Sequence, residues 1–339
     1  MDGIWLIVTA LVSFGVTAAS GIWLVPYLRR LKYGQTILDI GPKWHKNKQG
    51  TPTMGGLMFI MGILVAVAVG YITAMVTHDW ATHPEYSGAG EKIFYGMVMA
   101  LLFGAIGFLD DYIKVAKKRN LGLTARQKLF FQIAIAAIYL AGLWSAGVSS
   151  TVVIIPFLGQ IDLGLLYYPV AVFVIVGAVN AVNLTDGIDG LAASVTFVAA
   201  VAFMVISSLL RMWDMNIVAT ALAAGCVGFL VWNFHPAKVF MGDTGSLFLG
   251  GMVCALGFGT GLPVFLVLIG IVYVCETLSD IIQVAYFKST GGKRLFKMAP
   301  IHHHFEMSGW SEKKIVAVFS AVTALGSAVA IWAVTLLLR

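Results

Sequence analysis

Long apolar segments alternate with short polar ones along the chain. Ten of them have, or nearly have, the length of about 20 residues that a helix needs to cross a bilayer. They span residues 4–28, 54–77, 93–109, 129–147, 165–182, 191–210, 216–234, 245–262, 263–287 and 315–338. The pattern predicts an all-α polytopic membrane protein with about ten transmembrane helices, in a single integral membrane domain over residues 1–339.

Composition agrees with this prediction. Hydrophobic residues make up 59% of the chain and charged residues 11%, a balance that does not fit a soluble domain. The net charge of +6 lies in a few loops without a basic and aromatic repeat, so the sequence does not indicate nucleic-acid binding. Cys226, Cys254 and Cys275 lie in apolar segments at spacings that fit neither a zinc site nor a disulfide framework, and we expect buried thiols.

The basic residues give an orientation. Loops that follow the odd-numbered helices hold 19 of the 22 Lys and Arg residues. The positive-inside rule therefore places these loops in the cytoplasm and both termini on the outer (periplasmic or extracellular) side. The cytoplasmic loops that carry polar motifs span about residues 29–53, 110–128, 183–190, 235–245 and 288–314.

Five aspartates and one asparagine gather in three of these loops. They are Asp110, Asp111, Asn183, Asp186, Asp189 and Asp243. A carboxylate beside an apolar segment is costly and by default marks a functional site. Several carboxylates from separate segments predict a metal site, and nearby Lys and Arg residues suggest that the metal's partner is a phosphate.

The pair Asp110 and Asp111 is predicted to end the third helix. Adjacent carboxylates repel each other unless a cation lies between them, and acidic groups at a helix C-terminus oppose the helix dipole. Function is therefore favoured over a solvated helix end. The pair can orient Mg²⁺ through water, or one member can act as a general base.

The segment Asn183-Leu-Thr-Asp186-Gly-Ile-Asp189-Gly joins the fifth and sixth helices. Polar side chains spaced by three share a face if the segment is helical. A helix cap would account for one such residue and not for the whole set. Gly187 and Gly190 allow close approach of the backbone.

The segment from Asn233 to Asp243 follows the seventh helix. Gly242 precedes Asp243, and the N-terminus of the next predicted helix offers free N–H groups to an anion. Phe240 can stack on a base or serve as an interfacial aromatic residue.

Histidines mark the last cytoplasmic loop. His302, His303 and His304 are consecutive and cannot share one helix face, which disfavours a three-histidine zinc centre. Beside the basic residues of that loop they favour phosphate contact over a solvated polar loop. Lys48 and Thr53 precede the second helix and suit an anion site, or a helix cap with an interfacial lysine.

These motifs together resemble a known superfamily, the polyprenyl-phosphate N-acetylhexosamine-1-phosphate transferases. The resemblance lies in Phe108-Leu-Asp-Asp111, in the segment 183–190, in Gly242-Asp-Thr-Gly245 and in Pro300-Ile-His-His-His-Phe-Glu306. Within it, Gly50-Thr-Pro-Thr-Met-Gly-Gly56 and the histidine segment resemble the bacterial phospho-N-acetylmuramoyl-pentapeptide-transferases. Each motif alone is a weak signal, but their order on one face is specific.

The resemblance implies a reaction and a location. UDP-N-acetylmuramoyl-pentapeptide would give its phospho-sugar to undecaprenyl phosphate, releasing UMP and forming lipid I. The family requires Mg²⁺ and is typically homodimeric in the bacterial cytoplasmic (inner) membrane, among membrane lipids and with the active site toward the cytoplasm.

The resemblance also implies residue roles. Asp243 would hold Mg²⁺, and Asp110 and Asp111 would help the metal or deprotonate the lipid phosphate. The uridine and diphosphate side would be lined by Asn183, Asp186, Asn233 and Phe240. The polar cleft would be completed by Lys48, Thr53, Asp189, His302, His303 and His304.

Alternatives remain at this point. An N-acetylglucosamine-1-phosphate transferase would use the same acids and the same lipid. A cation-coupled transporter would need acids near the bilayer midplane and access from both sides. Direct attack by the lipid phosphate and a covalent phospho-sugar–aspartate intermediate both fit the acidic motifs.

Overall fold

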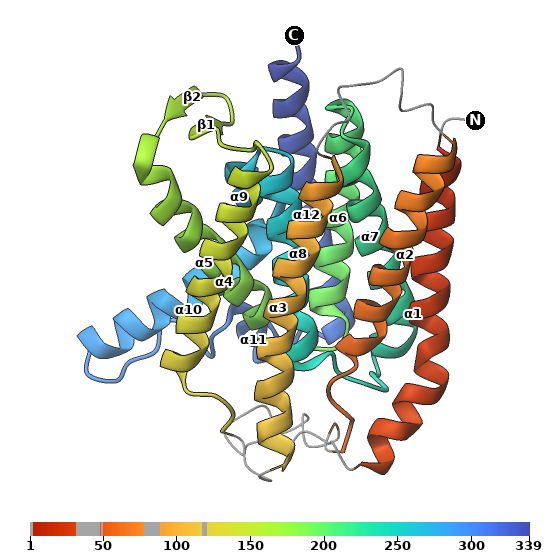
Figure 1. Cartoon of the computed structure of the whole chain (residues 1–339). Coiled ribbons are helices and arrows are strands. Elements are labelled where there is room, and N and C mark those ends of the chain that lie inside the picture. Colours follow the sequence, from red (N-terminus) through yellow and green to blue (C-terminus); the bar gives the residue numbers. More distant parts are fainter. Residues whose placement is uncertain (1–2, 32–47, 49, 78–88, 117–120) are drawn as a thin grey trace.

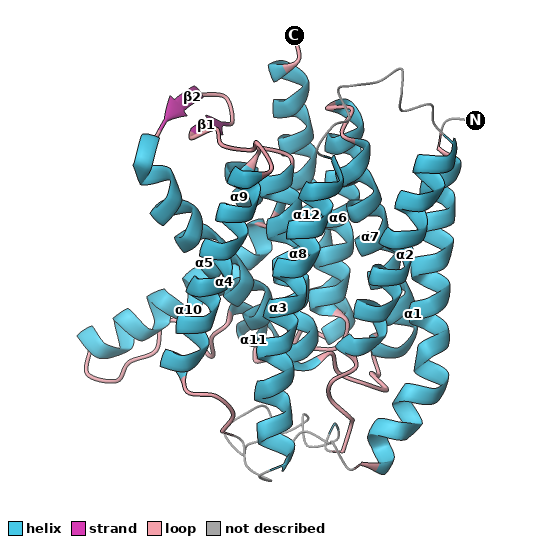
Figure 2. Cartoon of the chain, in the orientation of Figure 1, coloured by secondary structure: helices cyan, strands magenta, loops and turns pink. Residues whose placement is uncertain are grey.

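The computed structural model describes residues 3–31, 48, 50–77, 89–116 and 121–339. Helices dominate this part of the chain (Figure 2), and most of the long ones form one bundle (Figure 1). The long helices are α1 Ile4–Arg30, α2 Gly56–Thr77, α3 Ala89–Ala116, α4 Ala125–Ser145, α5 Tyr167–Thr185, α6 Leu191–Leu209, α7 Trp213–Asn233, α8 Gly242–Gly259, α10 Ile271–Ser289 and α12 Glu312–Leu337.

Shorter elements connect them. They are the strands β1 Val152–Ile155 and β2 Gly159–Asp162, the 3-10 helices η4 Gly164–Leu166 and η5 Pro263–Phe265, and the helices α9 Leu266–Ile269 and α11 Ile301–Glu306. β1 and β2 pair antiparallel, with Val152 opposite Asp162, in a hairpin between α4 and α5 that the hydrophobic pattern did not predict.

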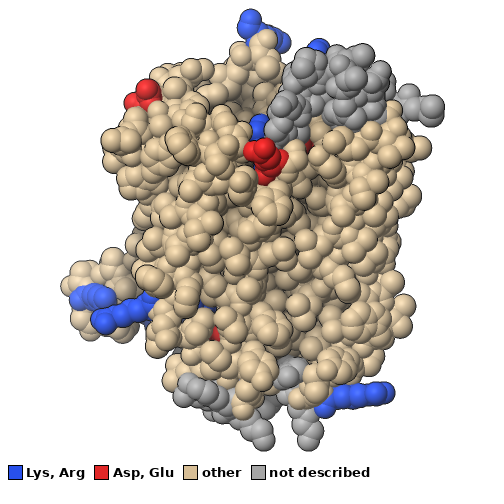
Figure 3. Space-filling model, viewed as in Figure 1, with Lys and Arg blue, Asp and Glu red and all other residues tan. Residues whose placement is uncertain are grey.

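Eight of the described helices are long and apolar enough to cross a membrane: α1 to α4, α5 extended by η4, α6, α7 and α12. A broad uncharged belt crosses the face seen in Figure 3. The chain is therefore a polytopic membrane protein. The first turn of α1 and the last turn of α12 lie at the same end of the bundle (Figure 1). The count of about ten spans and the outer location of the termini stay predictions.

The ninth apolar segment, predicted as one helix over residues 263–287, is broken at Gly270. The part formed by η5 and α9 is bent by 82° from α10. A Cβ at Gly270 would lie 2.6 Å from the carbonyl oxygen of Leu266, so the break uses a residue without a side chain. α10 consequently leaves the bundle sideways (Figure 1).

α8 lies at the centre of the packing, because every residue from Thr244 to Gly259 is buried. A Cβ at Gly250 would lie 2.7 Å from the Cα of Val179 on α5, and one at Gly251 would lie 2.8 Å from the Cα of Ala100 on α3. Glycine thus lets the three backbones approach closely.

Two local predictions are wrong. α3 does not end at Asp110 and Asp111 but continues to Ala116, so the acidic pair lies inside the helix. In the sequence the pair looks like a helix end because it interrupts the apolar run. Cys226 and Cys254 are buried as expected, but Cys275 is exposed because it lies on the projecting α10.

We expect Gly251→Ala to lower the unfolding temperature, because the added methyl group pushes α3 away from α8. Overpacking of this kind costs about 1–3 kcal/mol. Gly177→Ala on α5 is the matched control, since a Cβ there meets nothing within 4 Å. Thermal unfolding of the detergent-solubilised variants tests this, and equal unfolding temperatures would contradict the close packing.

Candidate active site

Three carboxylates from two helices meet at the end of the bundle where α3 ends. Asp110 and Asp111 lie on α3, and Asp243 lies in the first turn of α8. One ligand oxygen from each lies within 4.8 Å of the others, and we call the three residues the aspartate cluster. Asp110 and Asp111 are buried, whereas the side chain of Asp243 keeps 20% of its surface exposed.

Asp111 holds the start of α8. Its carboxylate accepts hydrogen bonds from the backbone N–H of Asp243 at 3.3 Å and of Thr244 at 2.9 Å, and from the Thr244 hydroxyl at 2.7 Å. A helix N-terminus favours an anion because its N–H groups are unpaired and carry partial positive charge. The sequence suggested a ligand anion here, but the chain's own carboxylate takes that place.

Two lysines neutralise part of the cluster. Nζ of Lys114 lies 2.6 Å from Asp110 and 3.3 Å from Asp243. Nζ of Lys128, on α4, lies 3.1 Å from Asp110 and 2.7 Å from Asp243. Asp110 also accepts a hydrogen bond from the backbone N–H of Leu123 at 2.8 Å. Asp110 therefore keeps both ammonium groups beside Asp243.

Asn183 joins this site from α5. Its amide donates to Oδ1 of Asp243 at 3.1 Å and to the hydroxyl of Ser246 at 2.7 Å. α5 ends at Thr185, so the segment is not helical throughout, and the condition under which Asn183, Asp186 and Asp189 would share one helix face is not met.

Asp186 caps the C-terminus of α5. Burial, and then the negative charges of Asp243, Asp111 and Asp189, raise the pKa of this carboxyl group to about 8. Part of this shift is the repulsion that a further negative charge meets beside these carboxylates. A cation placed there would relieve that repulsion.

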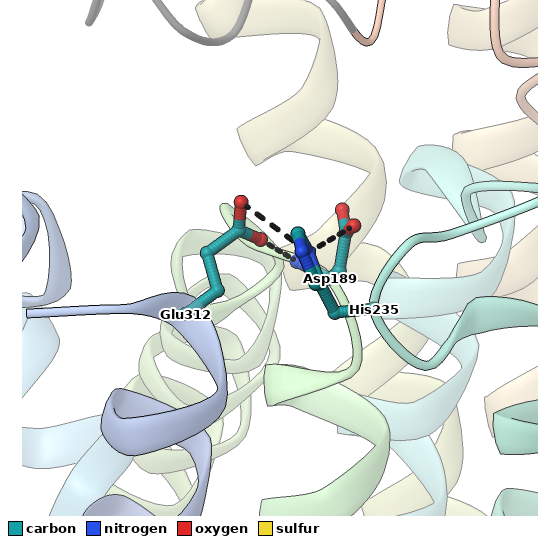
Figure 4. Close-up of side chains that lie close together, drawn as sticks. All are labelled: Asp189, His235 and Glu312. Carbon is teal, nitrogen blue, oxygen red and sulfur yellow. Dashed lines mark hydrogen bonds and ion pairs between the residues drawn. The ribbon is translucent and has the colours of Figure 1, made fainter.

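Asp189 belongs to a second group, the Lys48 cluster of Lys48, Asp189, His235 and Glu312. Nζ of Lys48 lies 2.7 Å from Asp189 and 2.7 Å from Glu312. Nδ1 of His235 lies 3.0 Å from Asp189 and 3.7 Å from Glu312. Figure 4 shows Asp189, His235 and Glu312 pointing toward one another from separate segments.

Both clusters have the ligand types that could hold a metal ion. In the Lys48 cluster an ammonium group already lies between the two carboxylates. The aspartate cluster likewise has one more carboxylate than ammonium groups, three against two, but it offers oxygen ligands alone, which suits a hard cation.

Asn233, Phe240 and Thr53 lie in the framework around these clusters. The Asn233 side chain accepts from the N–H of Gly190 at 3.1 Å and donates to the carbonyl of Val239 at 2.9 Å. The N–H of Phe240 donates to the carbonyl of Pro52 at 2.8 Å. A Cβ at Gly242 would lie 2.6 Å from the Thr53 hydroxyl oxygen, so these segments pack tightly.

The three histidines on α11 have three different partners. His302 is fully buried, and its Nδ1 lies 3.0 Å from a carboxylate oxygen of Glu276. Nδ1 of His303 lies 2.7 Å from Glu306. His304 accepts a hydrogen bond from the N–H of Lys297 at 3.1 Å.

The structure thus joins Asp110, Asp111, Asp243 and Asn183 directly, and Lys48 with Asp189. His302, His303 and His304 have Glu276, Glu306 and Lys297 as partners, and the His302 ring lies against the turn between α5 and α6, where a Cβ at Gly187 would collide with it. Sequence reasoning assigned no site role to Lys114, Lys128, His235 and Glu312. For Lys114 a signal was present, because it follows Asp110 by one helical turn.

Comparisons with known proteins extend this picture. Residues 93–260 match the family model of glycosyl transferase family 4, and residues 48–60 match the phospho-N-acetylmuramoyl-pentapeptide-transferase signature 1. Proteins named phospho-N-acetylmuramoyl-pentapeptide-transferase are similar over nearly the whole chain. The one from Halalkalibacterium halodurans is 44% identical over 328 residues, 96% of this chain and 97% of the relative. The one from Heliobacterium modesticaldum is 48% identical over 319 residues, 94% of each chain.

We expect Thr244→Val to destabilise the protein, because it removes one donor to the buried Asp111 carboxylate while preserving the side-chain shape. A hydrogen bond to a charged group contributes about 1.5–3 kcal/mol. Thr77→Val is the control, since that hydroxyl is exposed and donates to carbonyl oxygens of its own helix. Chemical unfolding in detergent measures the two changes; a loss no larger than that of Thr77→Val would show that Asp111 does not secure α8.

Proposed function

The chain belongs to the phospho-N-acetylmuramoyl-pentapeptide-transferase family, and we propose that the aspartate cluster is its catalytic centre. The reaction transfers phospho-N-acetylmuramoyl-pentapeptide from its UDP derivative to undecaprenyl phosphate, giving lipid I and UMP. It is the first membrane step of peptidoglycan synthesis. The observation that carries the proposal is the meeting of Asp110, Asp111 and Asp243 from two helices beside two lysines.

The cluster fits Mg²⁺, because its ligands are carboxylate oxygens and Mg²⁺ prefers one or two carboxylates together with substrate oxygens and water. Asp243 is the ligand we assign, since it is the most exposed of the three and can reach an ion that also binds substrate. When bound there, Mg²⁺ would neutralise charge that develops on the diphosphate and on the leaving UMP.

The remaining side chains position the reacting groups. We assign Lys114 and Lys128, which carry positive charges beside Asp243, to bind the phosphate groups of donor and acceptor. Asn183 fixes one oxygen of Asp243, and Asp111 fixes the backbone that carries it. These contacts pre-organise the cluster before substrate arrives.

We place this site at the cytoplasmic face of the bacterial inner membrane. The support is the concentration of Lys and Arg residues in the loops at that end. A location at one end of the bundle suits an acceptor phosphate presented from the bilayer, and it disfavours a transporter, which needs acids near the midplane. A homodimer is part of the proposal and rests on family resemblance alone.

The N-acetylglucosamine-1-phosphate transferase alternative keeps the same chemistry. The names of the relatives and the signature over residues 48–60 favour the muramoyl-pentapeptide donor. We expect the purified protein, given undecaprenyl phosphate, to release UMP from UDP-N-acetylmuramoyl-pentapeptide and not from UDP-N-acetylglucosamine. Release should stop when EDTA removes divalent ions and return with Mg²⁺. Release from the second donor alone would replace the donor but keep the chemistry.

We expect Asp243→Asn to abolish UMP release, because an amide is a poorer ligand for Mg²⁺ and does not pair with Lys128 as an ion. Asp162→Asn is the matched control on the hairpin between α4 and α5, where Asp162 is exposed and accepts from Thr151. The initial rate of UMP release at saturating substrates is the measurement. Turnover near that of the Asp162→Asn protein would remove Asp243 from the metal role.

A further inference from the structure

The Lys48 cluster ties together four segments that lie far apart in the sequence. Lys48 precedes α2, Asp189 lies in the turn between α5 and α6, His235 follows α7 and Glu312 begins α12. Oε2 of Glu312 accepts from Nζ of Lys48 at 2.7 Å and from the backbone N–H of Asp189 at 2.9 Å. One carboxylate oxygen therefore contacts two of the other segments.

Two of the three N–H donors of the Lys48 ammonium group have partners among the described residues. An ammonium group has three N–H donors. Within the described part of the chain, Nζ of Lys48 donates to Asp189 and Glu312, each at 2.7 Å. The side chain keeps 16% of its surface exposed, so it is within reach of a ligand. One N–H is left for an oxygen atom of that ligand.

Glu312 lies in the first turn of α12, after Ser311, whose side chain accepts from the N–H of Lys314 as the N-cap. The positive end of the helix dipole favours a carboxylate here. Asp189 has further donors, because its Oδ2 accepts from the N–H of Ala237 at 3.0 Å and lies 3.0 Å from His235. Loss of Glu312 would therefore disturb Lys48 more than Asp189.

We infer that Glu312 is a positioning residue that acts through Lys48 and sets the affinity for the UMP part of the donor. The inference rests on the proposed function for its substrate. Glu312 and Asp189 each fix one of the three directions in which the Lys48 ammonium can donate, so the third is pre-organised toward a nucleotide oxygen. Without Glu312 the lysine pairs with Asp189 alone and loses that orientation.

The test uses the full chain in detergent with UMP as the probe. The Kd for UMP and the steady-state KM values for donor and acceptor lipid are measured for E312Q, K48A and the double variant E312Q/K48A. E91Q is the matched control, because Glu91 is exposed in the first turn of α3, away from the aspartate cluster. Unfolding temperatures report whether each variant is folded.

We expect E312Q to raise the Kd for UMP and the donor KM about tenfold, the loss of one charge-assisted contact. The acceptor KM and kcat should change less than about twofold, because a misplaced Lys48 weakens nucleotide binding and leaves the reacting groups in place. Adding E312Q to K48A should change nothing further. E312D, which keeps the charge with a shorter reach, should lie between wild type and E312Q.

Other results would overturn the inference. Multiplying effects of E312Q and K48A would show that Glu312 does not act through Lys48. A fall in kcat and a rise in both KM values, with a lower unfolding temperature, would show a purely structural role. If E312Q does not fold, an unchanged Kd for UMP in E312D would reject the idea. Wild-type protein that binds UMP without turnover would contradict the proposed reaction alone, and wild-type protein that does not bind UMP would reject the inference.

Discussion

The contact between the Asp111 carboxylate and the first turn of α8 is the interaction on which the site depends. In a buried setting, the N–H groups of Asp243 and Thr244 need an acceptor, since unpaired backbone donors away from water are costly. Asp111 supplies it from α3, and the helix dipole makes an anion favourable there. Because Asp243 is itself one of these donors, the bond that starts α8 also fixes the position of its exposed carboxylate.

This arrangement requires the helices to be unusually close. A side chain at Gly107 of α3 would collide with the backbone of Asp243 and Thr244, and one at Gly251 would press on Ala100 further along the same interface. Without a hydrophobic driving force between helices in lipid, small residues that allow close contact are the main source of specific packing. The acidic residues at one end of α3 and α8 therefore depend on the glycines of these helices, which allow the two backbones to lie close enough for the contact.

The sequence predicted those parts that a bilayer or a single residue type dictates. Span length follows from membrane thickness, so most apolar segments were located correctly. The choice of Asp110, Asp111 and Asp243 as site candidates followed from the cost of charge beside lipid, and the structure brings their carboxylates together. The break at Gly270 was not predictable from composition, because apolar residues continue on both sides of it. Pairings such as Lys128 with Asp243 join residues 115 positions apart, and no local pattern contains that information.

The turn between α5 and α6 links the two clusters. Its polar residues bond to different partners, so a single helix cap does not account for them. Asn183, before the turn, bonds to Asp243, and Asp189, near its end, bonds to Lys48. Asp186 lies between them in the negative potential of both groups. Gly187 brings the same turn against His302 of α11. A short stretch of backbone thus touches the proposed metal ligand, the proposed nucleotide lysine and the histidine segment. If a donor binds at Lys48 and reacts at Asp243, the distance between these points is set by this turn, and Gly187 is the residue that lets the His302 ring approach it, because a side chain there would collide with the ring.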